Sequence, residues 1–184
     1  MAKIRLFIAI DVNFSDKINE LCQNLKNSKT NIKIVEPENV HLTLKFLGDT
    51  NENLLGDIED IIKTSIEDIK PFNLRLKSIG CFPNQNYIKI LWIGIEKSEK
   101  LKIIAEKIDG KTNKIGFKKE IREFSPHLTI ARVRSAKNKE NLIKIINKYN
   151  DVEFGNINVS DIKIIKSTLT RKGPIYEVLK QIEI

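Results

Sequence analysis

The sequence predicts two α/β lobes that are related by a pseudo-twofold axis and packed into one body. Strand-like and helix-like segments follow the same order twice along the 184 residues. The only histidines, His41 and His127, lie in the tetrapeptides "HLTL" and "HLTI", each on the third element of its half. No Gly/Ser linker separates the halves. We therefore expect one domain over 1–184, with lobes of roughly 1–80 and 81–184 and C-terminal strands that can return to the first lobe.

Four helices are predicted from apolar residues that recur three and four positions apart, the pattern of a helix with one buried face. The first and third follow Ser15 and Ser98, which are good N-cap residues. Cys22 falls on the apolar face of the first helix, so we expect a buried thiol. The apolar stripes span Ile18–Leu25, Leu54–Ile69, Leu101–Ile108 and Leu142–Tyr149.

Seven strands are predicted from short apolar runs between these helices. Two turn signals separate neighbouring strands, "CFPNQN" at Cys81–Asn86 and "RKGP" at Arg171–Pro174. Strand, helix, histidine strand, helix is the order in both halves. The expected strands are Arg5–Asp11, Val40–Leu47, Phe72–Gly80, Tyr87–Ile95, His127–Val133, Ile162–Thr170 and Ile175–Ile182.

Composition indicates a globular protein with a possible polyanionic partner. There are 32 Lys and Arg against 24 Asp and Glu, a net charge of +8, although the lysines are scattered along the whole chain. No apolar run reaches the roughly 18 residues that cross a bilayer. Two cysteines form neither a disulfide framework nor a metal motif. We expect a cytoplasmic protein that does not enter a membrane.

Strand alternation predicts which side chains of each motif face a cleft between the lobes. In the first motif the polar set is His41, Thr43 and Lys45, and the apolar set is Leu42, Leu44 and Phe46. In the second, His127 and Thr129 share one face. A pseudo-twofold axis then brings two histidines and two threonines into one site.

Two imidazoles suit acid–base chemistry, because one can accept a proton while the other donates one. Threonine hydroxyls can bind phosphate oxygens, so phosphoryl transfer fits this set. A single His-x-Thr is usually structural, but two equivalent copies argue against that interpretation. A metal site lacks further ligands at suitable spacing, and neither cysteine lies near a motif to act as a nucleophile.

The segments "RLFIAI" (Arg5–Ile10), "ENVHLTLKFLG" (Glu38–Gly48) and "FSPHLTIARV" (Phe124–Val133) resemble the 2H phosphoesterase superfamily. Within it, the chain looks like the RNA 2′,3′-cyclic phosphodiesterases, also called 2′-5′ RNA ligases. The resemblance implies an α+β fold of two lobes, with two antiparallel sheets that face a central groove and helices on the outside. It also implies hydrolysis of an RNA 2′,3′-cyclic phosphate to a 2′-phosphate, without metal or other cofactor.

The resemblance assigns roles to the motif residues. His127 is expected to be the general base that activates water, and His41 the general acid that protonates the leaving ribose oxygen. Thr43 and Thr129 are expected to hold the phosphate. Each histidine would supply about 10²–10⁴ in rate.

Four further residues are weaker candidates. The family places an arginine where Arg132 stands, but strand parity points this residue away from His127 unless the strand bulges or ends near Ala131. Arg134 has the right parity and is the alternative phosphate ligand. Phe7 is a candidate for stacking on a base, or a core residue, and Lys45 is a candidate for attracting phosphate.

Two other functions fit the same motifs. A 2′-5′ RNA ligase would run the reaction in reverse on 2′,3′-cyclic phosphate and 5′-hydroxyl ends. A binding module would hold RNA ends without turnover. The expected partners are RNA ends, tRNA fragments among them, or small cyclic nucleotides, and the expected state is a monomer.

Overall fold

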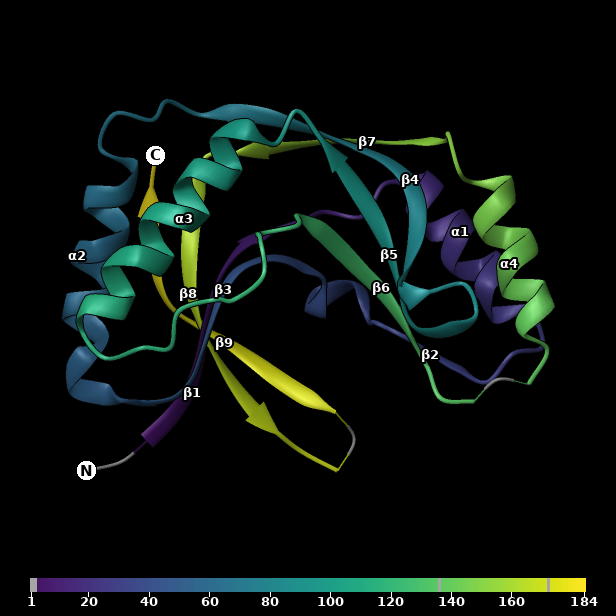
Figure 1. Cartoon of the computed structure of the whole chain (residues 1–184), viewed down its shortest axis with the longest axis horizontal. Helices are drawn as coiled ribbons and strands as arrows, with labels where there is room; N and C mark the ends of the chain where they lie inside the picture. The colour runs from purple at the N-terminus through teal and green to yellow at the C-terminus, as the bar shows by residue number, and fades with distance from the viewer. Residues whose placement is uncertain (1–2, 136, 172) are drawn as a thin grey trace.

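Two antiparallel β-sheets form the body of the protein in a computed structural model, which describes residues 3–135, 137–171 and 173–184 (Figure 1). The first sheet has the strand order β3-β1-β8-β9, and the second has the order β2-β6-β5-β4-β7. The first sheet consists of β1 (Lys3–Asp11), β3 (His41–Asn51), β8 (Asp161–Leu169) and β9 (Pro174–Glu183). The second consists of β2 (Ile32–Ile34), β4 (Phe72–Asn84), β5 (Tyr87–Glu96), β6 (His127–Val133) and β7 (Glu153–Val159).

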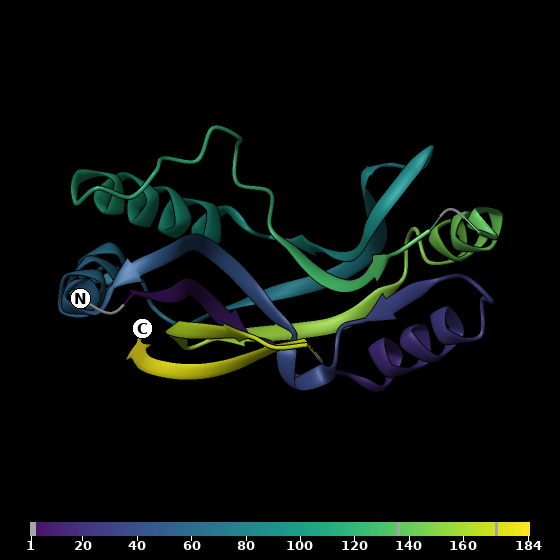
Figure 2. The ribbon, with the colours of Figure 1, turned by 90° about the horizontal axis from the view of Figure 1, so that it is seen from below.

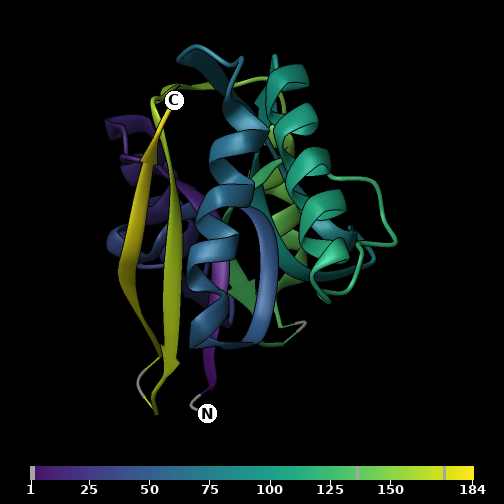
Figure 3. The same cartoon turned by 90° about the vertical axis from the view of Figure 1, so that its left-hand side faces the viewer.

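Four α-helices pack on these sheets in two pairs at opposite ends of the molecule (Figures 1 and 2). Helices α2 and α3 contact each other and strands of the first sheet (Figure 3), whereas α1 and α4 contact strands of the second. The predicted α+β fold of two lobes is confirmed. The helices are α1 (Asp16–Lys26), α2 (Leu55–Ile66), α3 (Glu99–Lys114) and α4 (Lys139–Lys148), with short 3-10 turns η1 (Pro37–Asn39) and η2 (Glu52–Leu54).

The helices form where the apolar stripes predicted them, because each stripe is buried against a sheet. Ser15 caps α1, since its hydroxyl accepts a hydrogen bond from the backbone N–H of Ile18 at 3.3 Å. Ser98 precedes α3 without such a bond. Cys22 is buried on the inner face of α1, as predicted.

All seven predicted strands are present, and two others were missed. β2 has only three residues, and β7 contains Gly155 at a φ of 122°, so neither shows a clear apolar alternation. The first turn signal is partly wrong. Cys81–Asn84 continues β4 and pairs with β5, because the turn needs only Gln85 and Asn86. Of the second turn, Lys172 lies outside the described residues, and Thr170 and Gly173 hydrogen-bond across it.

The predicted boundary near residue 80 does not separate the two sheets. β8 and β9 return to the first sheet, as the sequence allowed, but β2 and β4 from the first half belong to the second sheet. Two helices also pack on the sheet that most of the other half of the chain forms. α1 contacts the second sheet and α3 contacts the first, so each lobe contains a helix from the other half of the chain.

A β-bulge in β3 reverses the expected orientation of Lys45 and Phe46. Ala9 of β1 pairs with Thr43, but the next residue, Ile8, pairs with Lys45, so Leu44 is the extra residue. Lys45 therefore shares the core face with Ile8 and is only 2% exposed. The expectation that Lys45 attracts phosphate in the cleft is wrong.

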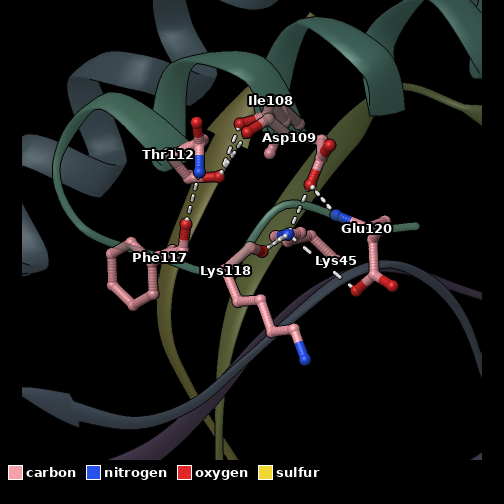
Figure 4. A network of polar contacts seen from close by, with 8 residues as sticks. Lys45, Ile108, Asp109, Thr112, Phe117, Lys118 and Glu120 are labelled. Carbon is pink, nitrogen blue, oxygen red and sulfur yellow. Dashed lines mark hydrogen bonds and ion pairs between the residues drawn. The ribbon is translucent and has the colours of Figure 1, made fainter.

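The buried ammonium of Lys45 joins β3 to α3 and to the loop after it (Figure 4). It forms an ion pair with Asp109 and donates a hydrogen bond of 2.6 Å to the carbonyl oxygen of Lys118. The same Asp109 carboxylate accepts a hydrogen bond of 3.1 Å from the backbone N–H of Glu120. This network fixes the start of the loop that leads to His127.

Lys45→Met should lower the free energy of unfolding by about 3 kcal/mol, because it leaves the Asp109 carboxylate without its cation in a largely buried place. Adding Asp109→Asn should recover part of this loss. Urea unfolding of the single and double variants in a double-mutant cycle measures the coupling. Lys63→Met is the control, since Lys63 pairs with Glu59 on an exposed helix surface and should cost at most about 1 kcal/mol. Equal losses for both lysines would contradict this account.

Candidate active site

The two motif strands meet because a short segment carries the chain from one sheet to the other. β2 pairs with the end of β6, and the N–H of Val35 donates a hydrogen bond of 2.9 Å to the carbonyl oxygen of Ile130. The turn η1 then leads directly into β3, which approaches β6. His41 and His127 are the first residues of β3 and β6.

A β-bulge in β6 brings Arg132 to the same face as His127. Trp92 of β5 pairs with Thr129, and the next residue, Leu91, pairs with Ala131, so Ile130 is the extra residue. After this bulge Arg132 pairs with Ile90, which lies on the same side of β5 as Trp92. The conflict between parity and the expected position of Arg132 is resolved by the bulge.

The bulges in β3 and β6 occur at the same place in both motifs. Leu44 corresponds to Ile130, so Lys45 corresponds to the buried Ala131, and Phe46 corresponds to Arg132. We call the two faces that carry these residues the site faces, defined by His41, Thr43 and Phe46 on β3 and by His127, Thr129 and Arg132 on β6. Phe46 is 66% exposed there. Sequence reasoning placed it in the core, because nothing in "HLTLKFL" reveals the bulge.

Aromatic rings support His41. Phe7 lies 4.6 Å from it between ring centroids, and Tyr176 of β9 meets it edge-on at 5.1 Å. Phe7 is only 3% exposed, so its predicted stacking on a base is wrong; it is buried, the alternative that the sequence left open, and its ring packs beside the imidazole. Tyr176 was missed, because its sequence position far from both motifs gives no sign that β9 pairs with β8 and brings this ring to His41.

A second aromatic group surrounds His127. Phe82 meets the imidazole edge-on at 5.0 Å, and Trp92 lies 6.3 Å away. Trp92 packs over Gly80, where a Cβ atom would lie 2.2 Å from the indole ring. Only glycine leaves room for this ring, so Gly80 helps to position the wall beside His127.

Hydrogen bonding sets the tautomer of His127. Its Nδ1 lies 2.7 Å from the carbonyl oxygen of Ser125, and a carbonyl only accepts, so Nδ1 carries the proton. In the neutral ring Nε2 is then unprotonated and able to accept a proton. His41 likewise has a hydrogen bond with the backbone of the residue two positions before it, Asn39.

The pKa of His41 is lowered to about 4, mainly by burial and to a smaller extent by the charge of Arg132, against the opposing effects of the Asn39 hydrogen bond and the Asp11 carboxylate. Arg132 also lowers the pKa of the Tyr176 hydroxyl, although burial raises that pKa overall. Arg132 of the second sheet therefore acts on side chains of the first. β3 and β6 also contact each other, so the two site faces lie on strands that meet between the sheets.

Arg134 lies just beyond the end of β6, where its N–H donates a hydrogen bond of 2.8 Å to the carbonyl oxygen of Asn31. Together with Arg132 it lines a cavity at the end of β6. Across residues 3–135, 137–171 and 173–184, no three His, Cys, Asp or Glu side chains cluster as metal ligands do. None of the helices in these ranges is long and apolar enough to span a membrane.

Known proteins match this chain over nearly its whole length. The family model described as "AKAP7 2′5′ RNA ligase-like domain" matches residues 6–184. A protein of Methanocaldococcus jannaschii named RNA 2′,3′-cyclic phosphodiesterase is 46% identical over 180 residues, which is 97% of this chain and 99% of that protein. A protein of the same name from Methanothermobacter thermautotrophicus is 36% identical, over 95% of each chain.

Solved structures show the same fold at lower identity. Escherichia coli LigT in complex with 3′-AMP superposes with a TM-score of 0.73 at 21% identity, covering 99% of this chain and 98% of that one. A Thermus thermophilus protein superposes with a TM-score of 0.75 at 24% identity, covering 98% of this chain and 97% of that one.

The low pKa of His41 should make the folded protein less stable in mild acid. Its pKa is about 4 in the folded chain, whereas an unperturbed histidine, as in the unfolded chain, has a pKa of 6.5. Between these two pH values the unfolded chain therefore binds more protons than the folded one. The free energy of unfolding should therefore fall as the pH drops from 6.5 to 4, more steeply in the wild type than in His41→Asn. Denaturant unfolding across this range measures it. His127→Asn is the control that keeps the His41 contribution, and identical slopes for wild type and His41→Asn would refute the assignment.

Proposed function

This chain belongs to the AKAP7 2′5′ RNA ligase-like domain family of the 2H phosphoesterase superfamily, and on this premise we propose that it hydrolyses RNA 2′,3′-cyclic phosphate ends to 2′-phosphates. The observation that supports the proposal is the contact between β3 and β6, whose matching bulges give the two His-x-Thr motifs equivalent faces. The substrates are RNA ends, tRNA fragments among them, and small cyclic nucleotides.

His127 acts as the general base in this proposal. Its Nδ1 proton is engaged by Ser125, so Nε2 takes a proton from water as the water oxygen attacks phosphorus. Thr43 and Thr129, on the same faces as the histidines, donate hydrogen bonds to the phosphate oxygens. Arg132 stabilises the negative charge that develops on those oxygens.

His41 acts as the general acid and protonates the 3′ oxygen as its bond to phosphorus breaks. In the free protein a pKa of about 4 keeps this imidazole neutral at pH 7. The anionic cyclic phosphate favours the charged imidazolium, so substrate binding raises the pKa and brings the required proton. The acid is thus formed in the complex and not beforehand.

The same groups would join a 2′,3′-cyclic phosphate to a 5′-hydroxyl in place of water, as the ligase alternative requires. Water is present at far higher concentration, so hydrolysis is the main reaction in our proposal. We assign the activity to a monomer, since one chain supplies both motifs. We assign it to the cytoplasm, where the free thiols Cys22 and Cys81 would stay reduced.

His41→Ala and His127→Ala should each lower kcat by about 10²–10⁴ on an RNA ending in a 2′,3′-cyclic phosphate, with excess EDTA present. The product should be a 2′-phosphate, identified by its resistance to 3′-specific phosphatase. Circular dichroism of each variant checks that the fold is retained. Activity that survives both single substitutions, or that EDTA abolishes, would exclude this mechanism.

Phe46→Ala should lower kcat/KM about tenfold or more, because an exposed ring on the site face is placed to stack on the terminal base. Phe46→Tyr should keep most of the activity. Ile103→Ala is the control, since Ile103 is 47% exposed on α3. Both alanine variants should unfold at nearly the wild-type temperature. An unchanged kcat/KM in Phe46→Ala would show that the ring takes no part in binding.

A further inference from the structure

A cavity of about 440 Å³ lies at the end of β6, between the first residues of β5 and the start of α4. Its wall includes Arg132, which also stands on the site face of β6. Three other cations line it, Lys89, Arg134 and Lys139, and no acidic residue does so among the described residues. The cavity therefore adjoins the proposed catalytic centre and is strongly positive.

The charges of this cavity are largely uncompensated. Lys89, Arg132 and Arg134 form no ion pair within the described part of the chain, and the Nζ of Lys89 lies 5.0 Å over the Tyr87 ring. The Nζ of Lys139 donates to the carbonyl oxygen of Asn86 at 3.2 Å, which leaves its charge unpaired. Lys139 also begins α4, whose N-cap Asn138 provides no side-chain hydrogen bond to the first turn. An anion in the cavity would meet these cations and a positive helix end together.

A second hollow shares part of its wall with the first cavity. It is lined by Phe82, Arg122 and, in common with the first cavity, by Tyr87 and Lys89. Phe82 is the ring that meets His127 edge-on. Tyr87 is 59% exposed between the two hollows, so it offers a flat apolar surface beside the cations. Cations that alternate with an exposed aromatic ring are typical of surfaces that bind single-stranded nucleic acid.

We propose that this cavity binds the phosphodiester on the 5′ side of the terminal nucleotide, with Lys89 and Lys139 as its ligands. The inference rests on the proposed function, because it needs the cyclic phosphate to lie between His41 and His127. Arg132 then lies between the two phosphates, one held at the site faces and the other in the cavity. The enzyme would favour RNA ends over mononucleoside cyclic phosphates, which lack this diester.

The experiment compares three substrates: a mononucleoside 2′,3′-cyclic phosphate, a dinucleotide with the same terminus, and that dinucleotide with a neutral methylphosphonate linkage. In the wild type, kcat/KM should be about tenfold higher for the charged dinucleotide than for the other two. Lys139→Ala and Lys89→Ala should each remove most of this advantage and leave mononucleoside turnover unchanged. Lys139→Arg should retain it. Lys144→Ala is the matched control, an exposed α4 lysine outside the cavity.

Equal turnover of the charged and neutral dinucleotides by the wild type would overturn the proposal, as would equal losses on all three substrates in Lys139→Ala. Mononucleoside turnover by the wild type tests the proposed function separately. A binding measurement keeps the cavity testable even without turnover. Fluorescence anisotropy of a labelled dinucleotide should show weaker binding to Lys139→Ala than to Lys144→Ala, and a smaller dependence on salt. Equal affinity of these two variants would overturn the proposal.

Discussion

The extra residues at Leu44 and Ile130 shift the alternation of β3 and β6 by one position, immediately after each His-x-Thr motif. The placement of Lys45, Phe46 and Arg132 depends on this shift. Without it Arg132 would point into the core and Phe46 would be buried. With it, one lobe presents a guanidinium and the other an aromatic ring at equivalent places. The two motifs thus share their first three residues, His-Leu-Thr, and differ at the sixth, which is Phe46 in one and Arg132 in the other.

A second dependence connects the packing of His41 with its ionisation. Phe7 and Tyr176 hold the imidazole in place, and the burial that results is the main reason for its low pKa. The free site disfavours the charge that a general acid must carry. An anionic substrate supplies the missing stabilisation, so recognition of the phosphate and readiness for proton transfer become one event. His127 has other aromatic neighbours, Phe82 edge-on at 5.0 Å and Trp92 at 6.3 Å.

Local sequence was sufficient to predict the helices, because apolar residues three and four positions apart form a single buried face only in a helix. It was also sufficient for the two motif strands. Local sequence was not sufficient where the orientation of a side chain depends on residues that are distant in the sequence. A bulge depends on the register with β1 or β5, which no single strand records, and so Lys45 and Phe46 exchanged their expected places. The aromatic neighbours of His41 required knowing that β9 returns to the first sheet.

The exchange of α1 and α3 between the lobes has the geometry of a domain swap completed within one chain. Each sheet depends on the other half for part of the apolar surface that covers it, so neither half contains a complete core. The chain should consequently unfold as one cooperative unit, although it looks like two lobes in outline. Helix α3 is also connected to both motif strands: its Asp109 pairs with Lys45, four residues along β3 from His41, and the loop after it leads to His127. The two lobes that carry the His-x-Thr motifs therefore depend on each other for folding.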